Sequence, residues 1–394
     1  MGTIFDALRK NVRQYMMVIA LVAAMLVFGI ITGGIFFRPV NLTNLVLQNS
    51  YVLVLAVGML LCTLTGNVDL SVGSIVCFVG AIIGIMMVDL QMNPVITVIA
   101  ALAVGAAIGA FQGFWIAFVH VPPFIATLAG MLMYRGLGQA ILQGKTRAPF
   151  PQSYNLISTG YIADPIGGAI FGDAPHWHIL TIVIGLIITV AIIIGQVNGR
   201  KKQKSYGFDS GSDTAWLAKV IAIAVVLMAF TLVFASYRGF PNILIVLGVV
   251  IVGYQFVASK TVPGRHIYAL GGNIKAAKLS GIKTDWVMVW IYTNMAILSA
   301  VAAVIFTARL NSATPMAGTN FEMDAIAACY VGGSAVTGGV GTVIGAVVGG
   351  LFIGVLNNGM SILGVSTYWQ QVIKGIVLLA AVAFDLTSKA RSGK

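Results

Sequence analysis

Residues 178–196 read HILTIVIGLIITVAIIIGQ, a stretch without a single Asp, Glu, Lys or Arg. At about 1.5 Å of rise per residue, a helix of this length crosses the roughly 30 Å hydrocarbon core of a bilayer. Similar runs recur along the whole chain, in which 59% of the 394 residues are apolar and only 9% are charged. A soluble domain has too little interior to bury such an apolar fraction. The sequence therefore predicts a polytopic membrane protein.

The apolar runs favour α-helices over β-strands as the spanning structure. Each run is continuously apolar, whereas strands of a membrane barrel alternate apolar and polar residues over about ten positions. We expect a single all-α transmembrane domain over residues 1–394, with about ten to twelve crossings. Segments 69–89 and 324–339 are rich in Gly and Ser and each begins near an acid, which suggests broken or re-entrant helices. The predicted spans are 15–37, 43–65, 69–89, 93–119, 123–142, 178–196, 216–236, 241–259, 285–308, 324–339, 342–357 and 367–386.

The basic residues predict the orientation of the bundle, because short cytoplasmic loops hold an excess of Lys and Arg. Residues 197–215 and 260–284 are then cytoplasmic loops, 143–177 is an external loop, and both termini are cytoplasmic. The net charge of +12 is spread over these loops, so topology explains it better than nucleic-acid binding does. The basic residues on the cytoplasmic side are Arg9, Lys10, Arg13, Arg200, Lys201, Lys202, Lys204, Lys219, Lys260, Arg265, Lys275, Lys278, Lys283, Lys389, Arg391 and Lys394.

Motifs for chemistry are not recognisable in this sequence. The three cysteines, Cys62, Cys77 and Cys329, sit in apolar segments without metal-ligand spacing, so we expect buried thiols and no metal site. A glycine-rich stretch misses the phosphate-loop spacing, because five residues rather than four separate Gly138 from Gly144. We therefore predict a protein that is not an enzyme and needs no cofactor of its own.

The loop 260–284 has the pattern of a rigid cytoplasmic knob. Gly271 and Gly272 break the chain, Asn273 can cap a helix over 274–279, and Gly281 ends it. One interpretation is an interfacial helix whose lysines bind anionic lipid. The other is a coupling helix that docks in a groove of a separate ATPase. The shape of the loop alone leaves both open.

Five blocks of the chain resemble bacterial ABC permeases for ribose, xylose, arabinose and related monosaccharides. Residues 264–282, from GRHIYALGGN to AAKLSGI, are similar to the coupling loop of that family. Residues 66–74, GNVDLSVGS, resemble its G-x-I-D-L-S-V-G-S signature, with Val in place of Ile. Further matching blocks are PPFIATLAG leading to RGL at 122–137, EMDAIAA with the following glycine pairs at 322–341, and Asn-Gly at 358–359.

The resemblance covers residues 40 to 386 and is weakest over 145–240, where an extra pair of spans is predicted. This added length makes the chain most similar to xylose or multiple-sugar permeases. One departure is GAFQG at 109–113, in which Gln112 stands where the family pattern carries Asn. The amide is kept but is one methylene longer, which puts a substrate contact there in doubt.

The resemblance implies the membrane subunit of an ABC importer that translocates a monosaccharide, xylose or a related pentose or hexose, across the bacterial cytoplasmic membrane. It implies a second permease subunit, in a homodimer, together with a cytoplasmic ATP-binding subunit and an extracytoplasmic sugar-binding protein, with the bundle embedded in membrane lipid. The residues that it assigns to coupling with the ATPase are Arg265, Gly271, Gly272, Asn273, Ala276, Lys278, Leu279 and Gly281.

Polar residues inside predicted spans are the candidates for the translocation path. An unpaired charge at mid-bilayer costs a few kcal/mol, so such a residue faces a partner or a cavity. The alternative interpretation is an internal ion pair that locks helices, or a charge near enough to the interface to be wet, and Lys374 belongs to the same group. The predicted path residues are Asn67, Asp69, Ser71, Ser74, Gln112, Arg135, Glu322, Asp324 and Asn358.

Asp69 and Asp324 also carry two broader hypotheses. Each acid lies at the start of a helix of small residues, and a glycine-rich span follows that helix. This similarity suggests an internal repeat of two halves. A rival function is a self-sufficient sugar transporter driven by an ion gradient, with one of these acids as the coupling carboxylate.

Overall fold

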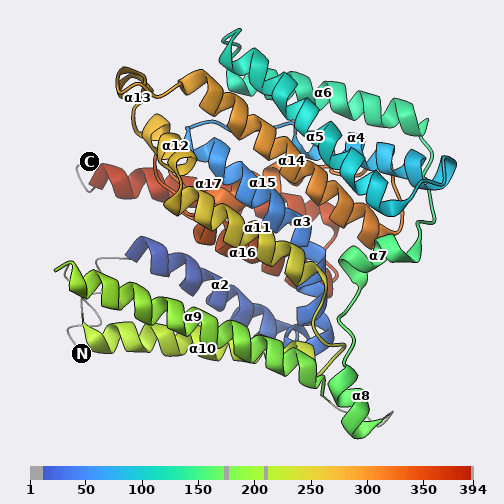
Figure 1. The fold of residues 1–394 in the computed structure, drawn as a ribbon, viewed down its shortest axis with the longest axis vertical. Helices are drawn as coiled ribbons and strands as arrows, with labels where there is room; N and C mark the ends of the chain where they lie inside the picture. The colour runs from blue at the N-terminus through green and yellow to red at the C-terminus, as the bar shows by residue number, and fades with distance from the viewer. Residues whose placement is uncertain (1–11, 173–176, 208–211, 392–394) are drawn as a thin grey trace.

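The computed structural model describes residues 12–172, 177–207 and 212–391, and over this part of the chain it is an all-α bundle (Figure 1). The all-α prediction is confirmed. The helices are α2 (Val12–Ile31), η1 (Ile35–Phe37), α3 (Pro39–Leu64), α4 (Val72–Gly84), η2 (Ile85–Asp89), α5 (Pro94–Ala117), α6 (Pro123–Leu142), α7 (Gln152–Thr159), α8 (Pro165–Phe171), α9 (Ile179–Ser205), α10 (Asp213–Ala235), α11 (Ile243–Lys260), α12 (Val262–Gly272), α13 (Ile274–Leu279), α14 (Thr284–Leu310), α15 (Phe321–Val331), α16 (Val343–Ile362) and α17 (Thr367–Arg391).

Local sequence explains where several of the spans begin. Helices α3, α5 and α6 each start with a proline in their first turn, where the missing N–H has no intrahelical partner to lose. Asn93 caps α5, because its side chain accepts a hydrogen bond of 2.8 Å from the Val95 amide. These prolines and the Asn93 cap therefore mark where the loops end and the spanning helices begin.

Helices α3 and α14 form the centre of the bundle. Within the described residues nine helices are long and apolar enough to span a membrane, and α2 and α17 contain shorter apolar stretches, Met17–Ile31 and Thr367–Ala383. The spanning window of α3 is 89% buried, as expected for a helix that is apolar on every side. The windows of α9 and α10 are only 17% buried, and these two helices pack mainly on each other. Most of the surface of that pair therefore faces away from the rest of the chain.

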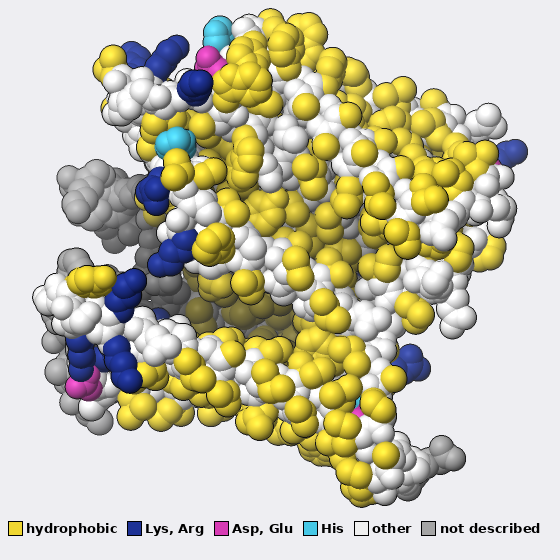
Figure 2. All heavy atoms as spheres, viewed as in Figure 1, with side chains coloured by type: hydrophobic (Ala, Val, Ile, Leu, Met, Phe, Trp, Pro, Cys, Tyr) yellow, Lys and Arg dark blue, Asp and Glu magenta, His cyan; other side chains and the backbone are white. Residues whose placement is uncertain are grey.

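The two ends of the bundle differ in charge. Helices α12 and α13, the start of α2 and the end of α17 lie at one end, whereas α7 and α8 lie at the other (Figure 1). On the face shown in Figure 2, most Lys and Arg side chains gather at the α13 end, and apolar side chains cover the surface between the two ends. This distribution is typical of a membrane-embedded bundle with one basic face.

The predicted span 324–339 is not a continuous helical crossing, in agreement with the expected broken helix. Helix α15 stops at Val331 and has 11 residues, or about 16 Å of rise, too short for a bilayer. A non-helical segment, 311–320, supplies the missing length by running beside α4 in the opposite direction. In that segment Ala313 packs on Gly84 near the end of α4, and Gly318 packs on Gly73 near its start. The chain thus crosses here as a non-helical half followed by a helical half.

Three predicted loops contain more helix than expected. Within the predicted basic loop 197–215, α9 continues to Ser205 through Arg and Lys residues that are good helix formers. Arg200 then pairs with Asp213, the first residue of α10. Most of 260–284 is helical, because Thr261 and the following proline start α12. The segment 143–177, predicted as an external loop, includes α7, which buries Tyr154 against α14 through a hydrogen bond of 2.7 Å with Thr307.

Candidate translocation and coupling site

The turn between α3 and α4 is built around Asp69. Its side chain is only 1% exposed and accepts hydrogen bonds from the Ser71 amide at 2.8 Å and the Ser71 hydroxyl at 2.6 Å. Gln112 of α5 donates to the same carboxylate at 3.4 Å. A carboxylate beside the first N–H groups of a helix also complements the helix dipole. Asp69 therefore holds the start of α4 and ties it to α5.

Arg135 of α6 binds the non-helical half, residues 311–320, of the discontinuous crossing. Its guanidinium donates to the backbone carbonyls of Ala317 and of Gly318, the latter at 3.1 Å. Glu322, in the first turn of α15, lies against Gly73 of α4. Glu322 Oε2 and the buried hydroxyl of Ser74 have no hydrogen-bond partner among the described residues. The predicted path residues of this region thus meet where α4, α6 and α15 converge.

Two further pairs join helices far apart in the sequence. Lys374 of α17 donates to Asp324 of α15 at 2.7 Å, and the two side chains are 19% and 9% exposed. Asn358 of α16 and Asn41 of α3 donate to each other at 2.9 and 3.0 Å. Asp324, Lys374 and Asn358 therefore occupy interhelical contacts. The discontinuous crossing is anchored at one side by Arg135 and at the other by Lys374.

A cavity of about 500 Å³, which we name the vestibule, opens at the α13 end of the bundle. Its walls come from the turn after α3, the α5–α6 turn, the junction of α12 and α13, the start of α14, and the loop between α15 and α16. Amide, hydroxyl, imidazole and carboxylate groups line it, a set that can hydrogen-bond an uncharged polyol. Its polar residues are Thr65, Asn67, His120, Asn273, Thr284, Asp285 and Thr337.

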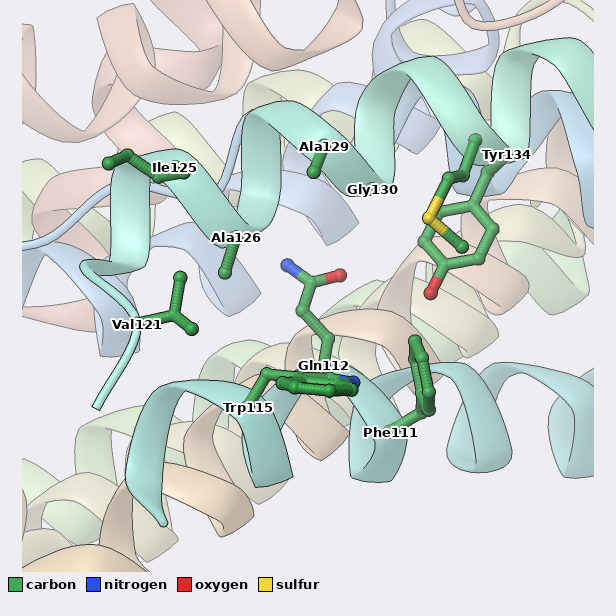
Figure 3. Close-up of a pocket in the computed structure, with 10 residues that line it drawn as sticks. Phe111, Gln112, Trp115, Val121, Ile125, Ala126, Ala129, Gly130 and Tyr134 are labelled. Carbon is green, nitrogen blue, oxygen red and sulfur yellow. The ribbon is translucent and has the colours of Figure 1, made fainter. Parts of the chain in front are cut away.

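A second cavity, of about 260 Å³, lies between α5 and α6 (Figure 3). The amide of Gln112 points into it, between Trp115 and Phe111 on α5 and the small residues Ala126 and Ala129 on α6. An amide that projects among aromatic rings offers both a hydrogen-bonding group and apolar faces. This cavity therefore suits a ligand with mixed polar and apolar surfaces.

Of the predicted path residues, Asn67 and Gln112 line these cavities. The other seven pack between helices as described above, so the geometry brings the set together around one discontinuous crossing rather than along one open channel. Sequence reasoning missed His120, Asp285 and Thr337 as vestibule residues. They belong to no recognisable motif, and five separate chain segments must fold together before they face one cavity.

The predicted coupling residues all lie at the α13 end. The Asn273 side chain accepts from the Ala276 amide at 3.0 Å, which confirms the predicted cap. Gly281, at φ +83°, closes α13 with two backbone hydrogen bonds, from Gly281 to Lys278 and from Ile282 to Ala277. Leu279 is 90% exposed at the tip of this knob. Gly271 is half-buried, and the remaining members of the set, Arg265, Gly272, Asn273, Ala276, Lys278 and Gly281, are exposed.

Tyr268 of α12 fastens this coupling region to the bundle. Its hydroxyl donates to the Gly341 carbonyl at 2.7 Å, between α15 and α16. Burial raises the pKa of the Tyr268 phenol, so it keeps the proton that this hydrogen bond requires. The coupling region is thus connected to the segment that follows the discontinuous crossing.

Comparison with known proteins agrees with this arrangement. Residues 41–382 match the family described as the permease component of the branched-chain amino acid transport system. The chain belongs to that permease family. The permease is 35% identical to the xylose transport system permease protein XylH of Escherichia coli strain K12 over 98% of this chain and 95% of the relative. It is 36% identical to XylH of Haemophilus influenzae, over 97% and 98% of the two chains.

A further relative is the ribose import permease protein RbsC of Escherichia coli strain K12, 33% identical over 89% of the permease and 87% of the relative. No solved structure matches the permease. A permease component is a transport subunit and not an enzyme. Its family and its apolar helices make it a multi-pass membrane protein. Nothing in these comparisons favours a self-sufficient transporter driven by an ion gradient.

Proposed function

We propose that the permease is the membrane subunit of an ABC importer that carries xylose, or a related pentose or hexose, across the bacterial cytoplasmic membrane. The observation that carries this proposal is the match to two xylose permeases over nearly the full length of both chains. The ribose permease covers less of the chain and is less similar. Xylose is therefore the first substrate to test, and ribose is the second.

The partners follow from what the permease presents at each end. The exposed knob α13 faces a cytoplasmic ATP-binding subunit, which fits the absence of a phosphate-binding motif in the sequence. The opposite end, with α7 and α8, faces an extracytoplasmic sugar-binding protein. Both termini are cytoplasmic, in agreement with the basic residues at the α13 end. A second copy of the permease completes the membrane unit.

Asn67 and Gln112 are the groups that we propose to contact the sugar. Their amides project into the vestibule and into the α5–α6 cavity, where they can donate to and accept from sugar hydroxyls. Asp69, Ser71 and Arg135 act beside the path by holding the broken segments in place. A transported sugar needs such polar, uncharged contacts, because a tight site would slow its release.

Docking through α13 predicts a large effect at Leu279. Leu279 is 90% exposed at the tip of α13, where a docked ATPase would cover it. Burial of a leucine contributes about 1.5–3 kcal/mol, so Leu279→Ser is expected to weaken ATPase association about 10- to 100-fold. Binding of the purified ATPase to the permease in nanodiscs would measure this, and Leu279→Met should bind normally. Equal binding by Leu279→Ser and the wild type would contradict the docking assignment.

The interfacial-lipid interpretation of α13 makes a different prediction. Neutralising Lys275 and Lys278 to Gln would then weaken the association of α13 with anionic lipid without affecting the ATPase. If Leu279→Ser binds the ATPase normally while the double Gln variant changes only lipid dependence, α13 is an interfacial helix.

Reconstitution in proteoliposomes tests the proposed function as a whole. We expect uptake of labelled xylose only when the permease, the ATPase, ATP and the sugar-loaded binding protein are all present. Uptake by the permease alone in response to a proton or sodium gradient would overturn the proposal. Uptake of ribose in place of xylose would leave the importer in place and correct its substrate.

A further inference from the structure

We propose that Gly271 transmits the movement of α13 to both non-helical segments that border the vestibule. This inference rests on the proposed function, because it assumes that an ATPase moves α13. It assigns Gly271 the role of a positioning residue for transport.

The contact that suggests this role is made by backbone on both sides. A Cβ atom added at Gly271 would overlap the carbonyl oxygen of Leu64 and would lie 2.6 Å from the Gly339 amide nitrogen. The Gly339 amide itself donates to the Leu64 carbonyl at 2.8 Å. Three chain segments therefore meet without intervening side chains. We call these three residues, together with Gly338, the glycine junction.

Each partner of Gly271 leads directly into a broken part of the bundle. Leu64 is the last residue of α3, and the following turn, 65–71, carries Asn67 and Asp69. Gly339 lies in the loop 332–342, which connects the short helix α15 to α16. Gly338 and Gly339 have φ values of +83° and +75°, a backbone conformation that glycine adopts without strain and that permits the close approach. One contact thus reaches both broken segments.

The connection between α13 and the glycine junction is short. Asn273 alone separates α12 from α13, and its side chain is already used to cap α13. A displacement of α13 must therefore move the end of α12. Because backbone groups cannot rotate aside as side chains can, Leu64 and Gly339 must move with it. The junction is a contiguous mechanical contact from the knob to the vestibule.

The vestibule wall shows what such a movement would change. Residues 270–274 line this cavity together with Thr65, Asn67 and Thr337. A shift at Gly271 would therefore change the distances between these lining segments and the position of the Asn67 amide. Through the junction, the ATPase would open or close the cytoplasmic mouth of the path.

A helical glycine outside the coupling residues provides the control. Gly271→Ala introduces a methyl group into the junction, whereas Gly253 of α11 is exposed and a Cβ there meets nothing within 4 Å. Both variants are expected to bind the ATPase normally, because the methyl group added at Gly271 faces Leu64 and Gly339. In proteoliposomes, Gly271→Ala should lower ATP-driven uptake about tenfold or more, with ATP hydrolysis no longer stimulated by the loaded binding protein, while Gly253→Ala stays within about twofold of wild type. Normal uptake by Gly271→Ala, or equal loss in both variants, would overturn the inference.

A second experiment keeps the inference testable if Gly271→Ala fails to fold. Ile274→Cys and Thr337→Cys place thiols in two segments that line the vestibule, and the native cysteines are buried and out of reach of a polar reagent. Joining the two thiols with a short, reducible cross-linker should abolish uptake without releasing the ATPase, and reduction should restore uptake. Uptake that continues in the cross-linked protein would rule out movement at the junction.

Failure of this inference can be told apart from failure of the proposed function. Wild-type permease is assayed in the same proteoliposomes, and absence of ATP-driven uptake there would refute the importer. A wild type that transports, beside a Gly271→Ala variant that transports equally well, would refute only the junction.

Discussion

Gly318→Ala is expected to remove most of the folded permease, whereas Gly144→Ala is expected to leave it nearly intact. Both glycines have φ +72°, so an alanine pays the same left-handed backbone strain at either position, about 1–2 kcal/mol. At Gly144 a Cβ atom meets nothing within 4 Å, but at Gly318 it would overlap the backbone carbonyl of Gly73. Overpacking adds about 1–3 kcal/mol or more.

The difference between these two variants isolates the packing of the discontinuous crossing from backbone strain. It can be measured as the fraction of monodisperse protein after detergent extraction and as the shift in melting temperature. Gly73→Ala should resemble Gly318→Ala, because its Cβ would overlap the Gly318 carbonyl from the other side. Equal melting temperatures for Gly144→Ala and Gly318→Ala would contradict the observed close contact with α4.

Lys374→Ala is expected to destabilise the permease by about 3–5 kcal/mol, because it leaves the buried carboxylate of Asp324 without its partner inside the membrane. The two groups lie 2.7 Å apart and join α15 to α17. The double variant Asp324→Asn with Lys374→Gln removes both charges and should recover much of the lost stability. Thermal melting in detergent measures this effect, and Lys219→Ala, on the exposed surface of α10, is the control with a shift near zero.

The same variants decide between the two interpretations of Asp324. If the pair locks helices, the double variant regains stability and transports sugar. If Asp324 instead contacts the substrate, the double variant folds but does not transport. A Lys374→Ala variant as stable as the wild type would show that the ion pair does not hold α15 in place.

Asp69 and Arg135, from two of the matching blocks, stabilise segments at and beside the discontinuous crossing. Asp69 fixes the start of α4, and Arg135 binds backbone carbonyls of the non-helical half of that crossing. Inside a membrane, backbone groups outside a helix need such partners, because lipid supplies none. Transporters commonly place broken helices beside the substrate path. The internal repeat inferred from Asp69 and Asp324 stays a prediction, since Asp69 precedes its helix and Asp324 lies within the first turn of its own.

Local sequence predicted the features that depend on short windows. The spanning helices follow from runs of about 20 apolar residues, and the cap of α13 at Asn273 and its end at Gly281 follow from two residues with strong local preferences. Short windows did not predict the point at which tertiary contacts override a local pattern. Segment 324–339 is apolar and small enough for a helix, but α15 ends at Val331, and the non-helical chain after it packs against Gly271 and Leu64.

By itself the sequence determined that the chain enters a membrane, that its spans are helical, and that a glycine-bounded knob lies between two of them. These properties depend on the transfer free energies and the backbone preferences of residues that are neighbours in the sequence. Only the tertiary structure decided that Lys374 pairs with Asp324, that Asn41 pairs with Asn358, and that Gly271 meets two distant backbones. Partners separated by tens or hundreds of residues leave no periodic trace in the sequence, because contact between them depends on how all the helices pack.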